Sequence, residues 1–129
     1  MGEVLVLPPA DAAAFMRQSR VVWDLMPANL LPAGAPAVAA SLWNQAQVCA
    51  GVAFAMGRAG SVDEDAAKTA LADAQALGGA VDGAERWEAR WVPPAHLAAG
   101  VADLAATVVV VLTALLDDGA GGTGGGGED

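Results

Sequence analysis

The sequence predicts an all-α fold, an alanine-rich helical hairpin or bundle of three to four helices. Hydrophobic residues make up 55% of the 129-residue chain but aromatic residues only 5%, because alanine supplies much of the apolar content. Alanine is the best helix former and leaves little side chain between neighbouring backbones, which favours closely packed helices. In addition, apolar residues recur at spacings of three and four over long segments, which is the helical period.

The chain begins with a segment that we expect to be extended. Residues 3–8 form a short arm in this prediction, because the run Val4-Leu5-Val6-Leu7 is rich in β-branched residues and stops at Pro8-Pro9. Such an arm could add to the edge of a partner protein.

The first helix is predicted from about Pro9 to Leu25. Trp23 widens its apolar stripe, so we expect two packing partners for this helix. The stripe itself consists of Ala12, Phe15, Ser19, Val22 and Met26.

The second helix is predicted from Pro36 to Arg58, after an ordered loop between Pro27 and Pro36. It is apolar on two faces and we therefore expect it to be the central helix. One face carries Leu42, Ala46, Cys49, Ala53 and Met56, and the other carries Trp43, Ala50 and Phe54.

The third helix is predicted to begin at a capping box formed by Ser61 and Glu64 and to end before Val92-Pro93-Pro94. Its glycines lead us to expect a bend or a very close helix contact near its middle. The predicted core stripe consists of Ala67, Ala70, Ala74, Leu77, Val81, Ala84, Trp87 and Trp91, and the glycines are Gly78, Gly79 and Gly83.

The fourth helix is predicted from about Ala95 to Asp118, with Leu97, Val101, Leu104, Val108, Val111 and Leu115 on one stripe. The 20 residues 97–116 approach the length of a membrane span, with Asp103 the only charge among them, so membrane association through them is an alternative. Residues 1–118 then form a single helical domain, and the acidic, glycine-rich tail 119–129 is expected to be disordered.

The charge and the reactive residues argue against several classes of function. A net charge of -9 argues against binding nucleic acid. Cys49 lies in an apolar run, which indicates core packing rather than a nucleophile, and the single histidine, His96, has no serine or cysteine partner near it in sequence. We therefore expect no catalytic residues, no metal site and no cofactor, and the prediction is that the protein is not an enzyme.

The most distinctive segment runs from Arg86 to Trp91. If it is helical, Trp87 and Trp91 share one face, with Arg86 and Arg90 on a neighbouring one. Tryptophan and arginine are the residues most enriched at binding hot spots. The alternative interpretation is the end of a core stripe topped by solvated arginines. The interaction residues predicted on this basis are Trp23, Trp43, Arg86, Trp87, Arg90 and Trp91.

Several of these features together resemble the small helical proteins associated with actinobacterial type VII (ESX) secretion. They are the extended start closed by Pro8-Pro9, the alanine-rich helices, the end bearing Trp87 and Trp91, and the lack of a recognisable Sec signal. The resemblance covers roughly residues 4–91. The chain departs from that pattern because residues 57–61 hold no Trp-x-Gly turn and the absence of tyrosine excludes a Tyr-x-x-x-Asp/Glu export signature. The resemblance implies an export-linked, non-catalytic protein that pairs with another helical protein.

The function predicted from the sequence is that of a non-enzymatic interaction protein, which packs against a helical protein partner or forms a homo-oligomer. One alternative is a small membrane-anchored protein held by the helix 97–116. Another is an accessory subunit of a larger enzyme or of a phage assembly. The expected location is cytoplasmic, or secreted without a Sec signal, with membrane association as the further alternative.

Overall fold

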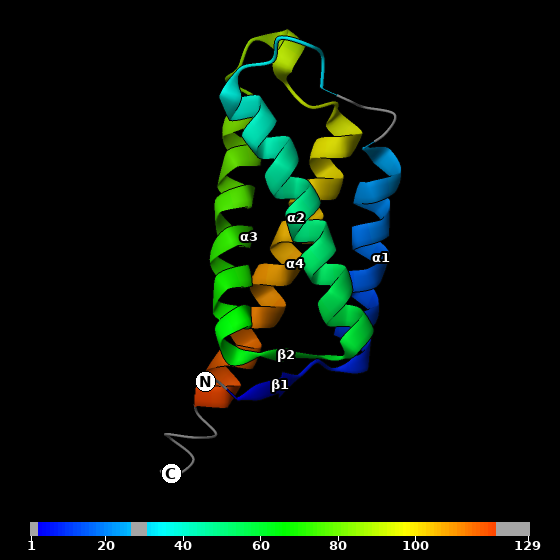
Figure 1. Ribbon diagram of the computed structural model, residues 1–129, viewed down its shortest axis with the longest axis vertical. Coiled ribbons are helices and arrows are strands. Elements are labelled where there is room, and N and C mark those ends of the chain that lie inside the picture. Colours follow the sequence, from blue (N-terminus) through cyan, green and yellow to red (C-terminus); the bar gives the residue numbers. More distant parts are fainter. Residues whose placement is uncertain (1–2, 27–30, 121–129) are drawn as a thin grey trace.

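The computed structural model describes residues 3–26 and 31–120, and it confirms the all-α prediction (Figure 1). Four long helices form a bundle: α1 (Pro9–Leu25), α2 (Ala37–Ala59), α3 (Glu64–Ala84) and α4 (Ala95–Ala120). Two short strands, β1 (Val4–Val6) and β2 (Ser61–Asp63), and a 3-10 helix over Ala89–Trp91 complete the described part.

The four helices follow one another around the bundle. The main packing partners of α1 are α2 and α4, and those of α3 are also α2 and α4. Contrary to the prediction, α2 is therefore not the central helix, and its outer side faces solvent. The predicted stripes of all four helices face the interior. The largest fully buried side chains of this interior are Phe15, Ser19, Val22, Leu77, Leu97, Leu104, Val108 and Leu112.

Helices α1 and α2 pack closely against each other at Gly57. A Cβ atom at Gly57 would lie 2.6 Å from the carbonyl oxygen of Ala12 and 2.9 Å from the Cγ atom of Met16. Only a residue without a side chain fits there. At the α3 glycines we expected a bend or a very close helix contact. The close contact is not found, because a Cβ atom at Gly78, Gly79 or Gly83 would meet nothing within 4 Å.

The N-terminal arm pairs with a segment of its own chain. Strand β1 is antiparallel to β2, with Leu5 opposite Val62, and these two side chains are buried against one end of the bundle (Figure 1). This ribbon also changes the start of α3, because Ser61 belongs to the strand and is not the cap. The N-cap is Asp63, whose carboxylate accepts hydrogen bonds from the backbone N–H groups of Asp65 (3.0 Å) and Ala66 (3.2 Å).

The third helix ends seven residues earlier than Trp91, at Ala84. The N–H groups of Arg86 and Trp87 donate to carbonyl oxygens three residues back, and the backbone at Glu88 is extended (φ -56°, ψ 139°). This tight turn and the following 3-10 helix place Trp87 and Trp91 outside any common helical face. The Pro93-Pro94 pair then separates the turn from α4.

The fourth helix starts at Ala95 as predicted and continues to Ala120, two residues past the predicted end. The rest of the segment predicted to be a disordered tail, residues 121–129, and residues 27–30 of the predicted loop lie outside the described residues.

A candidate docking groove between α2 and α3

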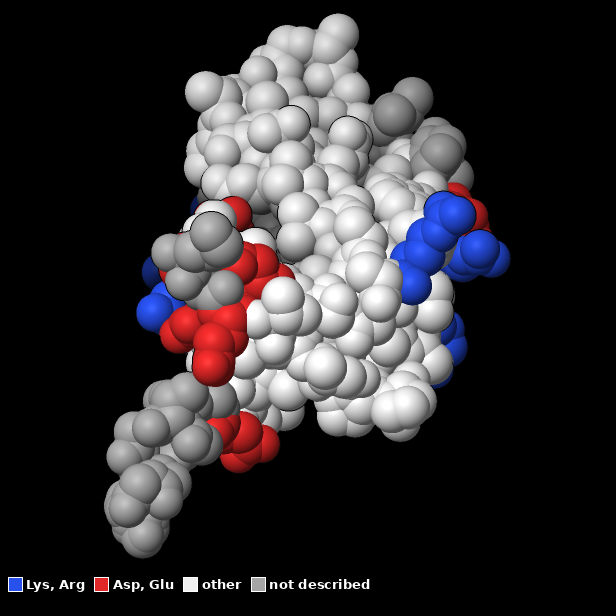
Figure 2. Space-filling view, turned by 60° about the horizontal axis from the view of Figure 1, so that its bottom comes forward, with Lys and Arg blue, Asp and Glu red and all other residues white. Residues whose placement is uncertain are grey.

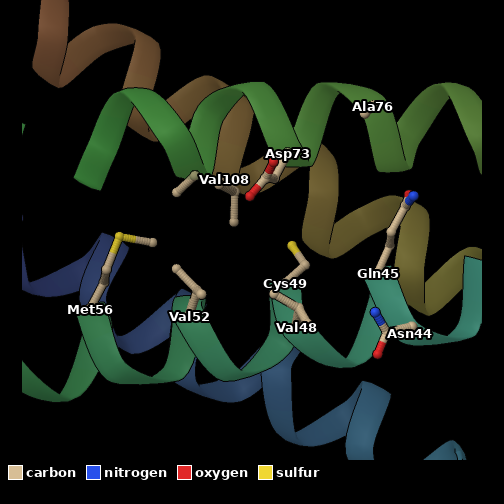
Figure 3. Close-up of a pocket in the computed structure, with 10 residues that line it drawn as sticks. Asn44, Gln45, Val48, Cys49, Val52, Met56, Asp73, Ala76 and Val108 are labelled. Carbon is tan, nitrogen blue, oxygen red and sulfur yellow. The ribbon is translucent and has the colours of Figure 1, made fainter. Parts of the chain in front are cut away.

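A groove of about 220 Å³ opens between α2 and α3 (Figure 3). It exists because α3 presents mainly small side chains along this seam, including Ala70 and Ala76, so that the two helices do not fill the space between them. Val108 of α4 forms part of the floor. The described residues that line the groove are Asn44, Gln45, Val48, Cys49, Val52, Met56, Ala70, Asp73, Ala76 and Val108.

The wall contributed by α2 is apolar and partly open to solvent. Val48 and Val52 lie one helical turn apart and are 48% and 39% exposed, whereas Cys49 and Met56 beside them are buried. The whole of α2 carries a single charged residue, Arg58 in its last turn. Exposed apolar side chains gathered at one groove are typical of an interaction surface.

The wall contributed by α3 supplies Asp73, which alone is charged among the lining residues that the structure describes. Its carboxylate points from α3 into the space between the two helices, toward Cys49 (Figure 3). The lysine on α3 is engaged elsewhere, since the Nζ atom of Lys68 lies 3.5 Å from Oε2 of Glu64. At one end of the groove Gln45 extends from α2 toward α3, and its amide nitrogen donates to Oγ of Ser41 at 3.1 Å.

The thiol of Cys49 is protonated at neutral pH. Burial, and to a smaller extent the negative charge of Asp73, raise its pKa from 9.0 to about 11. A protonated, buried thiol is a weak nucleophile. The side chain therefore acts as an apolar part of the groove, in agreement with the packing role expected for it.

Within residues 3–26 and 31–120, no three histidine, cysteine, aspartate or glutamate side chains gather in a group that could hold a metal ion. His96 is exposed in the first turn of α4. The described side chains that line the groove offer one carboxylate, two amides and a protonated thiol. This set suits binding better than acid–base catalysis, which needs converging groups of suitable pKa.

The six residues predicted as an interaction site lie on three parts of the chain, with Trp23 on α1, Trp43 on α2 and the other four in the segment after α3. Trp23 lies on the outer seam of α1 and α2, with its ring centroid 5.4 Å from that of Phe54. Trp43 and Trp87 pack against the core from different elements, and Trp91 is buried.

The two arginines of that predicted site are exposed, Arg86 in the turn after α3 and Arg90 in the 3-10 helix over Ala89–Trp91. The guanidinium of Arg90 lies over the ring of Trp91, 4.8 Å from its centroid, and 3.6 Å from the carboxylate of Glu88. Arg86 and Arg90 thus lie in different elements and share no helical face. The alternative interpretation was the end of a core stripe topped by solvated arginines. Trp91 fits it because it is buried, whereas Trp87 fits it less well because it is half-buried.

The sequence predicted Cys49, Met56, Ala70 and Val108 as core residues, but it did not indicate the groove or the exposed residues that line it. The signal was present in part, because Val48 and Val52 lie four residues apart on a helix already recognised as apolar on more than one side. Asp73 carries no such signal, since an aspartate on a helix is most simply a solvated side chain.

Charged residues are unevenly distributed over the surface. In the view of Figure 2, acidic side chains gather on one side of the molecule and most Lys and Arg side chains on the other, with a broad surface free of charge between them. The helices reflect this difference: α3 carries Glu64, Asp65, Asp73 and Asp82 against one lysine, while α2 has no acidic residue.

Helix α4 has the length and composition needed to cross a membrane over residues Ala95–Asp118, with a mean hydropathy of 2.2 in an 18-residue window. The core helix of a soluble bundle has the same properties, and in this fold α4 buries Leu104 and Leu112 against the other helices. Comparisons with protein-family models, with curated proteins and with solved structures find no match to this chain.

Proposed function

We propose that this protein is a non-enzymatic helical interaction protein that binds a helix of another protein in the α2–α3 groove. The observation that carries the proposal is the pair of exposed valines, Val48 and Val52, beside an open groove of about 220 Å³. A helix that laid an apolar ridge into this groove would remove both side chains from water, which stabilises association by about 25 cal/mol for each Å² of apolar surface buried.

The resemblance of residues 4–91 to small helical proteins of type VII secretion supports a helical partner, because those proteins pair with other helical proteins. Two narrower proposals are compatible with this one: export through such a system, and a role as the accessory subunit of a larger enzyme or phage assembly. In each of them a different partner protein would supply the helix that binds in the groove.

The proposal is tested with matched valine-to-threonine variants, since threonine keeps the branched shape and replaces one methyl group by a hydroxyl. The wild-type protein should bind a hydrophobic fluorescent dye, and the double variant Val48→Thr/Val52→Thr should lose most of that binding. Val110→Thr is the control, because Val110 is 67% exposed on α4 and does not line the groove. Light scattering on the same samples identifies a second copy as the occupant if the wild type dimerises and the double variant does not. A monomeric wild type that binds no dye would contradict the proposal.

A membrane-anchored protein is the second candidate, and the length and apolar composition of α4 favour it. Insertion of α4 would require Leu104 and Leu112 to leave the bundle core. Carbonate extraction of the membranes of expressing cells separates the two candidates: a bundle protein is released into the supernatant, whereas a protein anchored through residues 97–116 stays in the pellet.

A further inference from the structure

We propose that the groove selects a partner helix that places a lysine side chain beside Asp73, with the methylene stem of that lysine lying on Val48 and Val52. The inference rests on the function proposed above and adds the chemistry by which the partner is recognised.

The first argument is the inventory of charge at the groove. Among the described residues that line it, Asp73 alone is charged, and its carboxylate is directed into the open space (Figure 3). No ion pair joins Asp73 to any basic side chain in residues 3–26 and 31–120, whereas the nearest lysine along α3, Lys68, is paired with Glu64. Asp73 is exposed, so a docked cation would replace water at its carboxylate and would not displace a basic side chain.

The second argument is the arrangement of apolar and polar groups. Val48, Val52 and Met56 offer an apolar wall that a chain of methylene groups can cover, and Asp73 stands on the opposite wall. A lysine side chain has this division, with an apolar stem and a charged tip. The amide oxygen of Gln45 lies at the end of the groove as a further acceptor for an ammonium group.

The third argument concerns the reach of the carboxylate's field. The charge of Asp73 contributes to the raised pKa of Cys49 on the facing helix, so that charge acts across the groove. A partner that seated only neutral side chains here would remove water from Asp73 without replacing it, which costs free energy. A partner carboxylate would add repulsion, and the net charge of -9 adds to that repulsion at longer range.

The test uses three small probes that share a four-carbon stem: butylammonium, 1-butanol and pentanoate, at matched ionic strength. Binding is followed by the NMR shifts of the methyl groups of Val48, Val52 and Met56. Butylammonium should bind about two- to fivefold more tightly than butanol, the range expected for a partly exposed ion pair, and pentanoate should bind most weakly. Asp73→Asn should abolish the preference for the amine over the alcohol. Asp82→Asn, which removes the same charge from an exposed site on α3 outside the groove, should retain it.

The outcomes separate this inference from the function on which it rests. Equal binding of the three probes, or an unchanged preference in Asp73→Asn, would overturn the lysine selectivity and leave an apolar docking groove. No shift of the three methyl groups with any probe would overturn both. An alanine-based helical peptide with one lysine beside two leucines should bind more tightly than butylammonium. If the free amine binds as tightly as that peptide, the site serves small amines and the proposal of a partner helix is wrong.

Discussion

Substitution of Gly57 by alanine tests the packing of α1 on α2 most severely. The added Cβ atom would lie 2.6 Å from the carbonyl oxygen of Ala12, and a backbone atom cannot move away by changing a rotamer. Overpacking in a protein interior costs about 1–3 kcal/mol, and a contact with backbone belongs at the upper end of that range. Alanine also stabilises a helix by about 1 kcal/mol relative to glycine. The expected net loss is therefore about 2 kcal/mol in the free energy of unfolding.

The matched control is Gly79→Ala, at an exposed position in the interior of α3 where a Cβ atom meets nothing within 4 Å. Alanine has the higher helix propensity, and at this position its Cβ atom collides with no other atom, so the variant should stabilise the protein by about 0.5–1 kcal/mol. Urea denaturation followed by far-UV circular dichroism measures both variants. Because both changes replace a helical glycine by alanine, equal stabilities of the two variants would refute the close crossing at Gly57.

Three further perturbations follow from the fold. Asp63→Ala should destabilise the protein by about 1 kcal/mol in thermal denaturation because α3 loses its N-cap, whereas Ser61→Ala should have the smaller effect if the capping box predicted from sequence is absent. Leu104→Ala should cost about 2–5 kcal/mol as a core cavity, and a negligible loss would remove α4 from the bundle. The pKa of Cys49 is raised from 9.0 to about 11 in the folded protein, so between these pH values the folded thiol keeps a proton that the unfolded chain loses. The free energy of unfolding should therefore be constant below pH 9 and fall by about 2–3 kcal/mol as the pH approaches 11. Cys49→Ala should flatten that fall. The effect is readily resolved because the chain has no tyrosine and one lysine, so few other side chains titrate in this pH range. An unchanged dependence of the unfolding free energy on pH would contradict the buried thiol.

Much of the fold follows from local patterns in the sequence. The bounds of α1 were predicted correctly because proline stands at its start and just after its end, and the stripe on α4 because leucine and valine recur at the helical period. Both signals depend only on neighbours along the chain. The error at the end of α3 has the same origin, since Trp87 and Trp91 continue the helical spacing although the backbone leaves the helix at Ala84.

Features that depend on distant parts of the chain were not predictable in this way. The pairing of Leu5 with Val62 joins residues more than fifty positions apart, so no local pattern indicates it. The crossing at Gly57 depends on where α1 passes over α2, and the α3 glycines carry the same sequence signal without a close contact.

The candidate site also depends on parts of the chain that are distant in sequence. An excess of apolar surface on α2 was visible in the sequence, but the groove depends on the spacing of α2 and α3, and only the fold brings Asp73 opposite Cys49. Tryptophan content directed the prediction elsewhere, to residues that largely complete the core or pair within the chain. A bulky aromatic residue has a large apolar surface, and in a small bundle much of that surface is buried by packing against the residue's own chain.

The most direct test of the docking groove is photo-crosslinking from within it. A photoreactive amino acid is placed at Val52 in the groove or at Val110 on the outer side of α4, and each protein is expressed in the cells that make it naturally. The account predicts a crosslink from position 52 to a helical segment containing lysine, which mass spectrometry of the joined peptide identifies, and none from position 110. The same crosslinked partners from both positions, or a joined segment that is not helical, would contradict the account.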